Sequence, residues 1–268
     1  MSTATTTTTG SAEIQRQLWG ARAHDWATAQ EHQVANLYEV VLDQLGVGEE
    51  TELLDAGCGA GLAAQIAARR GAAVTGLDAT VELLEIARER VPHGRFTAGD
   101  LEALPYPDDA FDAITGFNSF QYAANPRAAL EQARRVARPG ARVAIITWAV
   151  PERCEAAVYL AALKPLLPPA PPNAPGPFAL STPGALEQLA TAAGLTPQDA
   201  DEVDCPWTYP DLDTALRGLM SAGPAVKAIQ TSGETVVRAA IETAIAQFRD
   251  HRGGYTIGSA FRYMIATA

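Results

Sequence analysis

The sequence predicts an α/β fold, built on a doubly wound and mostly parallel sheet with helices on both faces. Apolar runs end in acidic residues at Asp55, Asp78 and Asp100, as expected for buried strands whose carboxyl ends meet at one edge. Helical segments with apolar residues four apart separate these runs, and Gly71 closes the first of them. Strands that alternate with helices indicate a parallel sheet.

The turn that follows the first strand is the most informative stretch. Residues 53–61 read L-L-D-A-G-C-G-A-G, with glycine at every second position of the turn. Glycine accepts a positive φ without steric cost, and it lets a ligand lie against bare backbone. A nicotinamide-binding loop would read G-x-G-x-x-G, whereas this loop reads G-x-G-x-G after an acidic strand end. The loop resembles the cofactor loop of the class I S-adenosylmethionine-dependent methyltransferases.

The second and third strands carry companion residues at the spacing that this family shows. Asp78 lies about twenty residues beyond the glycine loop, where a carboxylate accepts hydrogen bonds from ribose hydroxyls. The third strand ends in Asp100, which Leu101 follows; in the family, such a pair meets the amino group and a ring nitrogen of adenine. Residues 104–112 read L-P-Y-P-D-D-A-F-D and are similar to the L-P-[FY]-x-[DE]-x-x-F-D signature of small-molecule methyltransferases.

Each acidic residue also has an ordinary structural explanation. A carboxylate at a strand end is most often a solvated cap, and Asp112, which precedes a buried strand, is interpreted in this way. Asp55, Asp78 and Asp100 differ because they follow successive strands, and that edge of an open α/β sheet is where ligands bind. Together with the glycine loop, they predict a cofactor site.

The resemblance implies a Rossmann-like sheet of seven strands with an antiparallel C-terminal strand. It also implies that S-adenosylmethionine is the cofactor and S-adenosylhomocysteine the product. No metal site is predicted, and no catalytic base is assigned. The residues expected to contact the cofactor are Asp55, Gly57, Cys58, Gly59, Gly61, Asp78, Ala79, Asp100, Leu101, Phe117, Asn118 and Trp26.

Composition and charge narrow the class of protein. The net charge of −11 argues against DNA or RNA as a partner, because phosphate contacts require clustered Lys and Arg. No apolar run approaches the roughly twenty residues that span a bilayer, so no membrane partner is expected. The three cysteines have neither metal-ligand nor disulfide spacing, and Cys58 is interpreted as a small residue of the loop. A cytoplasmic location is predicted, and the oligomeric state is left open.

The N-terminal region is expected to form a tail and then a helical lid. Residues 1–12, with their threonine run, lack the basic start and apolar core of a signal peptide and are interpreted as a disordered tail. Residues 13–46 look helical, with Trp19 and Trp26 seven apart on one face. In relatives, a helix of the form W-x-x-x-A-x-x-[WY] often folds over the donor site. The alternative is that both tryptophans simply pack the helix on the core, and Glu31 is expected to be a solvated surface residue.

The remaining chain is expected to belong to the same single methyltransferase domain, 13–268. The cofactor-binding core is placed at 50–150, and helical acceptor-side insertions at about 151–180 and 210–250. The first insertion is rich in proline, which excludes a long helix interior.

The other elements are predicted from apolar periodicity and turn residues. A tight turn at 138–141 reads R-P-G-A, in which P-G suits the central positions of a type II turn. Thr80 is expected to cap the helix that follows the second strand. The further predicted strands are 73–78, 95–100, 111–117, 142–148, 205–209 and 255–268, and the further predicted helices are 182–194, 211–223 and 233–249.

The predicted function is methyl transfer from S-adenosylmethionine to a small-molecule acceptor by in-line displacement. The chain resembles the group that includes quinone-biosynthesis and natural-product methyltransferases, and an apolar or aromatic natural product is the expected acceptor. The sequence lacks an N-P-P-[YF] stretch, which disfavours amide or nucleobase N-methylation. One alternative is a catalytically silent module that binds S-adenosylmethionine. Another alternative is a nicotinamide-dependent oxidoreductase. It is less favoured because the sequence contains no Y-x-x-x-K pair.

Overall fold

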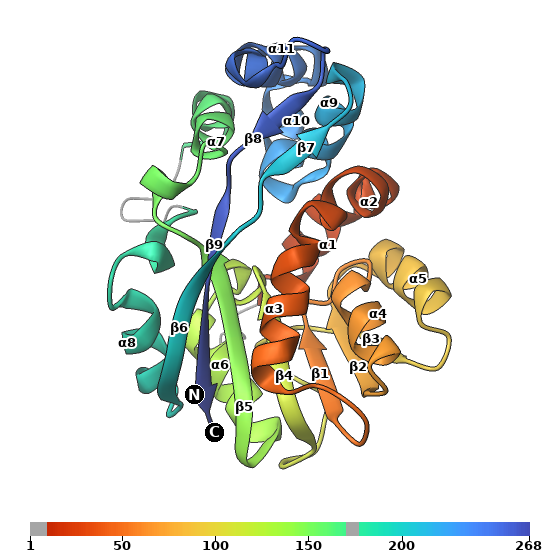
Figure 1. The fold of residues 1–268 in the computed structure, drawn as a ribbon, viewed down its shortest axis with the longest axis vertical. Coiled ribbons are helices and arrows are strands. Elements are labelled where there is room, and N and C mark those ends of the chain that lie inside the picture. The colour runs from red at the N-terminus through yellow and green to blue at the C-terminus, as the bar shows by residue number, and fades with distance from the viewer. Residues whose placement is uncertain (1–9, 170–176) are drawn as a thin grey trace, which may run out of the picture.

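The computed structural model describes residues 10–169 and 177–268, and its centre is a seven-stranded sheet (Figure 1). The strand order is β3-β2-β1-β4-β5-β9-β6, and β9 runs antiparallel to both of its neighbours while the others are parallel. The predicted mostly parallel sheet with an antiparallel C-terminal strand is confirmed. The strands are β1 (Glu52–Ala56), β2 (Ala73–Asp78), β3 (Arg95–Ala98), β4 (Phe111–Phe117), β5 (Ala137–Trp148), β6 (Thr196–Asp204) and β9 (Ala260–Thr267).

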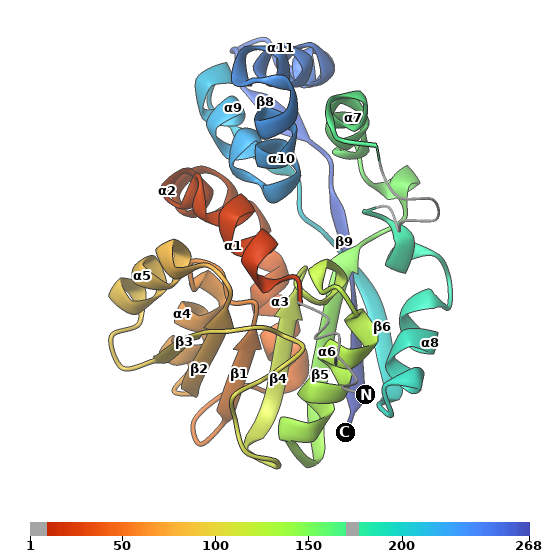
Figure 2. The ribbon, with the colours of Figure 1, turned by 180° about the vertical axis from the view of Figure 1, so that it is seen from behind.

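Helices cover both faces of this sheet, so the doubly wound arrangement is also confirmed. On one face, α3 and α4 bury Leu37, Val41 and Ile66 against the strands. On the other face, shown in Figure 2, α6 and α8 bury Leu130 and Leu186. The covering helices are α3 (Ala35–Leu45), α4 (Leu62–Arg69), α5 (Val81–Arg90), α6 (Pro126–Val136) and α8 (Ala185–Ala192).

A second group of helices stands beyond the carboxyl ends of the parallel strands, at the top of both views (Figures 1 and 2). A two-stranded antiparallel ribbon, β7 with β8, continues into this group from the β6 and β9 side of the sheet. Within the described ranges, no helix is long and apolar enough to cross a membrane. The elements of this group are α7 (Ala157–Leu163), β7 (Trp207–Tyr209), α9 (Leu212–Ser221), α10 (Gly223–Ser232), α11 (Glu234–Ile245) and β8 (Tyr255–Ile257).

The N-terminal helix predicted at 13–46 is broken into several pieces. Before α3, the chain forms α1 (Ala12–Gly20), α2 (Ala23–Asp25), a π-helical turn (Trp26–Gln30) and a 3-10 turn (Glu31–Val34). The π-helical and 3-10 turns contain the buried polar residues Gln30, Glu31 and Gln33, which hydrogen-bond to other elements of the fold. The helix starts at Ala12, inside the predicted tail, and residues 1–9 of that tail lie outside the described residues.

The strand predicted at 205–209 is found at Trp207–Tyr209, but it does not belong to the seven-stranded sheet. The edge of the sheet is β6, and residues 207–209 form β7 of the separate ribbon. β6 reads T-P-Q-D-A-D-E-V-D and is mostly exposed, since it pairs on one side only, so no apolar pattern marks it. The strand predicted at 255–268 is divided into β8 and β9, which belong to different sheets.

Two local predictions at chain turns need correction. Thr80 occupies the N-cap position of α5, but its side chain makes no capping hydrogen bond. The turn predicted at 138–141 interrupts the pairing inside β5 rather than preceding the strand: Ala137 pairs with Phe111, and Arg142 pairs with Ala113. Gly140 has the predicted left-handed conformation, with φ +81°.

Helix boundaries also shift, and three helices were not predicted. The helix predicted at 182–194 begins at Ala185, and the one predicted at 233–249 ends as α-helix at Ile245. α6, α7 and α10 are additional, and α7 lies inside the proline-rich insertion. Residues 170–176 of that insertion lie outside the described residues.

Candidate active site

The three acidic residues at or just beyond the carboxyl ends of the first three strands lie along one edge of the sheet, as predicted. Asp55 belongs to β1, Asp78 ends β2 and Asp100 follows β3. Because β1, β2 and β3 are neighbours in the sheet, their carboxyl ends occupy adjacent positions. This is the edge at which open α/β sheets bind ligands.

The glycine turn after β1 is held in place by β2. The N–H groups of Gly57 and Cys58 both donate to the carbonyl oxygen of Leu77, at 2.7 and 3.0 Å. All three glycines of the turn have a positive φ, which favours glycine there. The turn is therefore fixed by backbone contacts, independent of any ligand.

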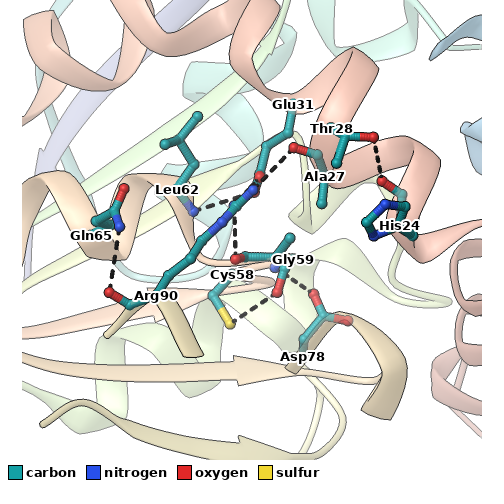
Figure 3. A network of polar contacts seen from close by, with 11 residues as sticks. His24, Ala27, Thr28, Glu31, Cys58, Gly59, Leu62, Gln65, Asp78 and Arg90 are labelled. Carbon is teal, nitrogen blue, oxygen red and sulfur yellow. Dashed lines mark hydrogen bonds and ion pairs between the residues drawn. The ribbon is translucent and has the colours of Figure 1, made fainter. Parts of the chain in front are cut away.

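Asp78 joins this turn to the start of α5, and Figure 3 shows its contact with Gly59. Its carboxylate accepts a hydrogen bond from the N–H of Gly59 at 2.9 Å and from that of Thr80 at 2.8 Å. Burial raises the pKa of this carboxyl group, and the backbone N–H groups oppose that shift. Each carboxylate oxygen retains a further lone pair, so Asp78 can still accept hydrogen bonds from a ligand's hydroxyls.

The three glycines serve different purposes. A Cβ atom on Gly57 would lie 2.3 Å from the Cβ atom of Ser119, and one on Gly61 would lie 2.7 Å from the Cβ atom of Ala87. A Cβ atom on Gly59 would find no other atom nearer than 3.8 Å. Gly57 and Gly61 are therefore required for packing, whereas Gly59 leaves its backbone open to a ligand.

Asp55 is buried, with 2% of its surface exposed, and only one of its oxygens is satisfied. Thr115 donates its hydroxyl to Oδ1 at 2.9 Å, and Oδ2 has no hydrogen-bond partner among the described residues. Burial raises the pKa of this carboxyl group to about 7; the Thr115 hydrogen bond lowers it, and the carboxylates of Glu31 and Asp78 raise it. Buried acceptors are normally paired, so Oδ2 is available to a donor group of a ligand.

Cys58 lies in the glycine turn, but its side chain points into the sheet. Its Sγ atom lies 2.8 Å from where a Cβ atom of Gly76 would stand, and only 6% of the residue is exposed. Burial raises the pKa of the thiol well above its usual value, so it remains protonated. Cys58 can meet a ligand through its backbone and not as a reactive thiolate.

Asp100 and Leu101 stand beyond β3, where adenine binding is expected. Asp100 accepts a hydrogen bond from the N–H of Glu102 at 2.9 Å. A Cβ atom on Gly10 would lie only 1.9 Å from Oδ2 of Asp100, so the chain that leads into α1 crosses directly over this carboxylate. Leu101 packs partly buried against the core, and Ala79 is partly exposed between β2 and α5.

Trp26 lies over the glycine turn, in the place predicted for a lid residue. Its Nε1 atom is 3.8 Å from where a Cβ atom of Gly59 would stand. Its ring packs edge-on against Trp19, with centroids 4.8 Å apart, and Trp19 packs in the same way against Tyr122 at 5.7 Å. These three residues, Trp19, Trp26 and Tyr122, form a continuous group that we name the aromatic wall.

The end of β4 carries the last two predicted residues. The ring of Phe117 packs edge-on against Tyr38 at 4.6 Å, which is a packing role. Asn118 has φ +51°, and its side-chain oxygen accepts a hydrogen bond from Gln121 at 3.0 Å. Positive φ is uncommon outside glycine and is often found at functional turns, so Asn118 marks the turn at which β4 leaves the sheet.

A buried ion pair at the site was not predicted (Figure 3). Glu31, only 3% exposed, pairs with Arg90 of α5 and accepts a hydrogen bond from the N–H of Leu62 at 3.3 Å. Arg90 also donates to the carbonyl oxygens of Ala60 at 2.9 Å and Ala27 at 3.0 Å. The expectation that Glu31 is a solvated residue is wrong, because it fastens residues 26–34 to the glycine turn and to α5.

No local sequence signal could have found this pair. The two residues are far apart in the chain, and glutamate is almost never buried unless it is paired. Burial raises the pKa of Glu31, and the charge of Arg90 opposes that shift. Glu31 reaches Arg90 only because residues 26–34 turn inward and break the predicted helix.

The arrangement fits S-adenosylmethionine. Gly59 offers bare backbone, Asp55 offers a buried acceptor atom without a partner, and Asp78 offers a carboxylate at the turn after β2. An aromatic ring beside a cation is attractive by about 0.5–2 kcal/mol, and Trp26 stands on the open side of the glycine turn. These residues offer the open backbone, the hydrogen-bond acceptors and the aromatic ring that such a cofactor requires.

Comparisons with known proteins agree with this geometry. A family model described as a methyltransferase domain matches residues 54–145. The demethylmenaquinone methyltransferase of Tropheryma whipplei is 39% identical over 129 residues, which cover 46% of this chain and 53% of that protein. The malonyl-[acyl-carrier protein] O-methyltransferase of Serratia marcescens is 37% identical over 108 residues, which cover 39% of this chain and 42% of that protein. The chain spans about half the length of the curated relatives it matches.

A solved structure extends the likeness in fold to most of the chain. The YcgJ protein of Bacillus subtilis superposes with a TM-score of 0.58 at 22% sequence identity, covering 87% of this chain and 97% of that one. The family match coincides with the strands and turns that hold Asp55, Asp78 and Asp100. Residues 54–145 therefore match a methyltransferase domain, the chain shares its fold with the YcgJ protein, and S-adenosylmethionine is the cofactor that these likenesses indicate.

Proposed function

We propose that this protein transfers a methyl group from S-adenosylmethionine to a small acceptor molecule that is apolar or aromatic, such as a natural product. The observation that carries the proposal is the open backbone of Gly59, flanked by Asp55 and Asp78 at the carboxyl edge of the sheet. A nicotinamide-dependent reaction has no comparable support, because the turn lacks the spacing of a dinucleotide loop.

The roles of the site residues follow from their positions. Asp78 would accept hydrogen bonds from the ribose, Asp100 and Leu101 would meet the adenine, and Asp55 would face the cationic amino group. When bound, S-adenosylmethionine supplies an electrophilic methyl group that an acceptor atom attacks in line as the sulfur departs with the bonding electrons. Holding the two reactants in line can contribute about 7–11 kcal/mol to lowering the barrier.

The acceptor is proposed from the residues around the donor site. The aromatic wall offers ring surfaces next to the glycine turn, which suits a flat apolar molecule. Demethylmenaquinone methyltransferase and malonyl-[acyl-carrier protein] O-methyltransferase, by their names, act on different acceptors, and each matches less than half of this chain. We propose an aromatic acceptor rather than an acyl carrier protein because of the wall.

The setting of the reaction is proposed on chemical grounds. All three cysteines are free, as is usual in the reducing cytoplasm, which is the location we propose. The net charge of −11 disfavours nucleic acid as an acceptor, and a small molecule is the partner we propose. Because the sulfonium methyl group is already electrophilic, we propose a reaction that does not depend on a metal.

Substitution of Gly59 by alanine is expected to separate binding from folding. The new methyl group meets no close atom, so the loss of folding free energy is limited to the left-handed strain of about 1–2 kcal/mol. The same methyl group would fill the space beside the Gly59 backbone that the ligand needs, so affinity for S-adenosylmethionine is expected to fall at least tenfold. Urea unfolding and calorimetric titration measure the two effects.

Gly61→Ala is the matched control, since its methyl group would lie 2.7 Å from that of Ala87. This variant is expected to lose much more stability than Gly59→Ala. Equal losses of stability in both, or full affinity in Gly59→Ala, would contradict the assignment of Gly59 as the open position.

A turnover assay tests the proposed function itself. The protein is incubated with S-adenosylmethionine and either reduced 1,4-naphthoquinone, catechol or a malonyl thioester, and S-adenosylhomocysteine and methylated product are quantified by mass spectrometry. Product formation that requires an aromatic acceptor supports the proposal. Tight binding of S-adenosylmethionine with no product from any acceptor favours the silent binding module instead.

A further inference from the structure

A cavity of about 310 Å³ lies between the sheet and the loop that joins β3 to β4. Its lining includes Glu52, Arg95 and Phe111, which are the first residues of β1, β3 and β4. The cavity therefore lies on the amino-terminal side of these strands, whereas the acidic residues of the donor site mark the carboxyl ends. Small-molecule sites have volumes of about 300–1,000 Å³, so this cavity has room for a small ligand.

The loop that covers this cavity is held in place by Arg135 of α6. Arg135 donates hydrogen bonds to the carbonyl oxygens of Leu104 and Tyr106, both at 2.8 Å, and to the carboxylate of Asp108 at 2.7 Å. The ring of Tyr106 packs edge-on against Phe111, with centroids 5.3 Å apart. Leu104 and Phe111 are both buried, so packing and hydrogen bonds within the protein fix the position of Tyr106.

The hydroxyl oxygen of Tyr106 is buried and has no hydrogen-bond partner among the described residues. Burial raises the pKa of this phenol, so it keeps its proton at neutral pH. Thr97 is near enough to oppose that shift of the pKa, but no hydrogen bond of ordinary geometry joins the two side chains. Buried hydroxyls are normally paired, and Tyr106 lines the cavity, so its O–H is available to a molecule bound there.

The polar part of the lining offers mainly hydrogen-bond donors. Arg95 donates from Nε to the Thr75 hydroxyl at 3.2 Å and from Nη2 to the Glu52 carboxylate at 2.9 Å, while its Nη1 donates to no residue that the structure describes. Because the Thr75 oxygen already accepts from Arg95, its own O–H can donate. Glu52 is the acidic side chain of the lining, and one of its oxygens is occupied by Arg95.

We propose that this cavity is a second ligand site, which binds a small carboxylic acid with an apolar body. An ionised carboxylate has only acceptor atoms, which match the free donors of Tyr106 and Arg95. Such charge-assisted hydrogen bonds are about twice as strong as those between neutral groups. Pro107, Ala110 and Phe111 supply apolar surface for the body of the ligand. The site is separate from the donor site, so it does not depend on the proposed function.

Benzoate and benzyl alcohol are probes that test this site, because they share a ring and differ in the charge of the polar group. Each is titrated at pH 7 into the full chain, and binding is followed by nuclear magnetic resonance. The wild type is expected to bind benzoate at least tenfold more tightly than benzyl alcohol. Tyr106→Phe, which keeps the ring that packs on Phe111, and Arg95→Met, at an exposed position, are each expected to weaken benzoate binding about tenfold and abolish this preference.

Two matched controls remove the same groups outside the cavity. Tyr263→Phe removes a phenol oxygen on β9, which β4 and β5 separate from β1, and Arg88→Met removes a guanidinium of α5. Both are expected to keep the preference of the wild type for benzoate. A preference that survives in Tyr106→Phe or in Arg95→Met overturns the proposal, and so does a wild type that binds neither probe or both equally.

Discussion

Asp55→Asn is expected to gain stability relative to the wild type as the pH rises from 5 to 8. The carboxyl group of Asp55 has a pKa of about 7 in the folded protein, compared with 3.8 in its ordinary state. Between these values the unfolded chain releases a proton that the folded protein keeps, so rising pH favours unfolding until about pH 7 is passed. Between pH 5 and 7 the wild type is expected to lose about 3 kcal/mol of unfolding free energy relative to the variant, at about 1.4 kcal/mol per pH unit.

Urea unfolding of both proteins at pH 5 and pH 8 measures this difference. Asparagine retains an oxygen for the Thr115 hydroxyl but carries no charge, so its stability should lack the contribution of Asp55 to the pH dependence. The same variant is expected to bind S-adenosylmethionine about tenfold more weakly, because an amide offers the amino group no charge. If the free energy of unfolding changed equally with pH in the two proteins, Asp55 would have its ordinary pKa and the prediction would be contradicted.

Asp112→Asn is the matched control at the opposite end of the parallel strands. The hydrogen bond and charge of Arg138 lower the pKa of Asp112, and its carboxylate also accepts the N–H of Glu52 at 2.9 Å. The sign is therefore reversed: this carboxylate stabilises the fold above its ordinary pKa and loses that contribution as the pH falls. The variant should lose a little stability at neutral pH and keep full affinity for S-adenosylmethionine, in agreement with the structural role predicted for Asp112.

Arg90→Met is expected to destabilise the protein by about 3–5 kcal/mol near pH 8, as removing one partner of a buried ion pair usually does. Glu31 would be left buried without a counter-charge, and the carbonyl oxygens of Ala27 and Ala60 would each lose a donor. The loss should be smaller at pH 5, because Glu31, whose pKa is already raised, can then become neutral. Urea unfolding at the two pH values gives both numbers.

Two companion variants decide whether the ion pair is the cause. Arg88 lies on the same helix and donates one exposed hydrogen bond, to the carbonyl oxygen of Phe96 at 3.0 Å, so Arg88→Met should cost well under 1 kcal/mol. The double variant Glu31→Gln with Arg90→Met removes both charges and should recover part of the loss. If the two substitutions were simply additive, the pair would not act as a unit.

The positions of the acidic residues and of the glycine turn at one sheet edge could be predicted because their signals are local. Asp55, Asp78 and Asp100 each end an apolar run, and the glycines between them are fixed by backbone conformation, which depends on neighbouring residues. α6 also carried a local signal, since Asn125 caps its start ahead of Pro126, a pattern typical of a helix N-terminus.

The parts that could not be predicted depend on distant contacts or on missing patterns. β6 has no apolar face because it is a mostly exposed edge strand, and Glu31 is buried only because Arg90 reaches it from another helix. The crossing of Gly10 over Asp100 likewise depends on how α1 packs against α5, and no sequence pattern predicts it. These features arise in tertiary packing, which overrides the preferences of single residues.

Calorimetric titration with S-adenosylmethionine, S-adenosylhomocysteine and NAD, each in a separate experiment, tests the central claim most directly. We expect both sulfur compounds to bind with micromolar affinity and NAD not to bind, since the glycine turn leaves Gly59 open between Asp55 and Asp78. Binding of NAD alone, or of none of the three, would contradict the assignment of this edge as a methyl-donor site.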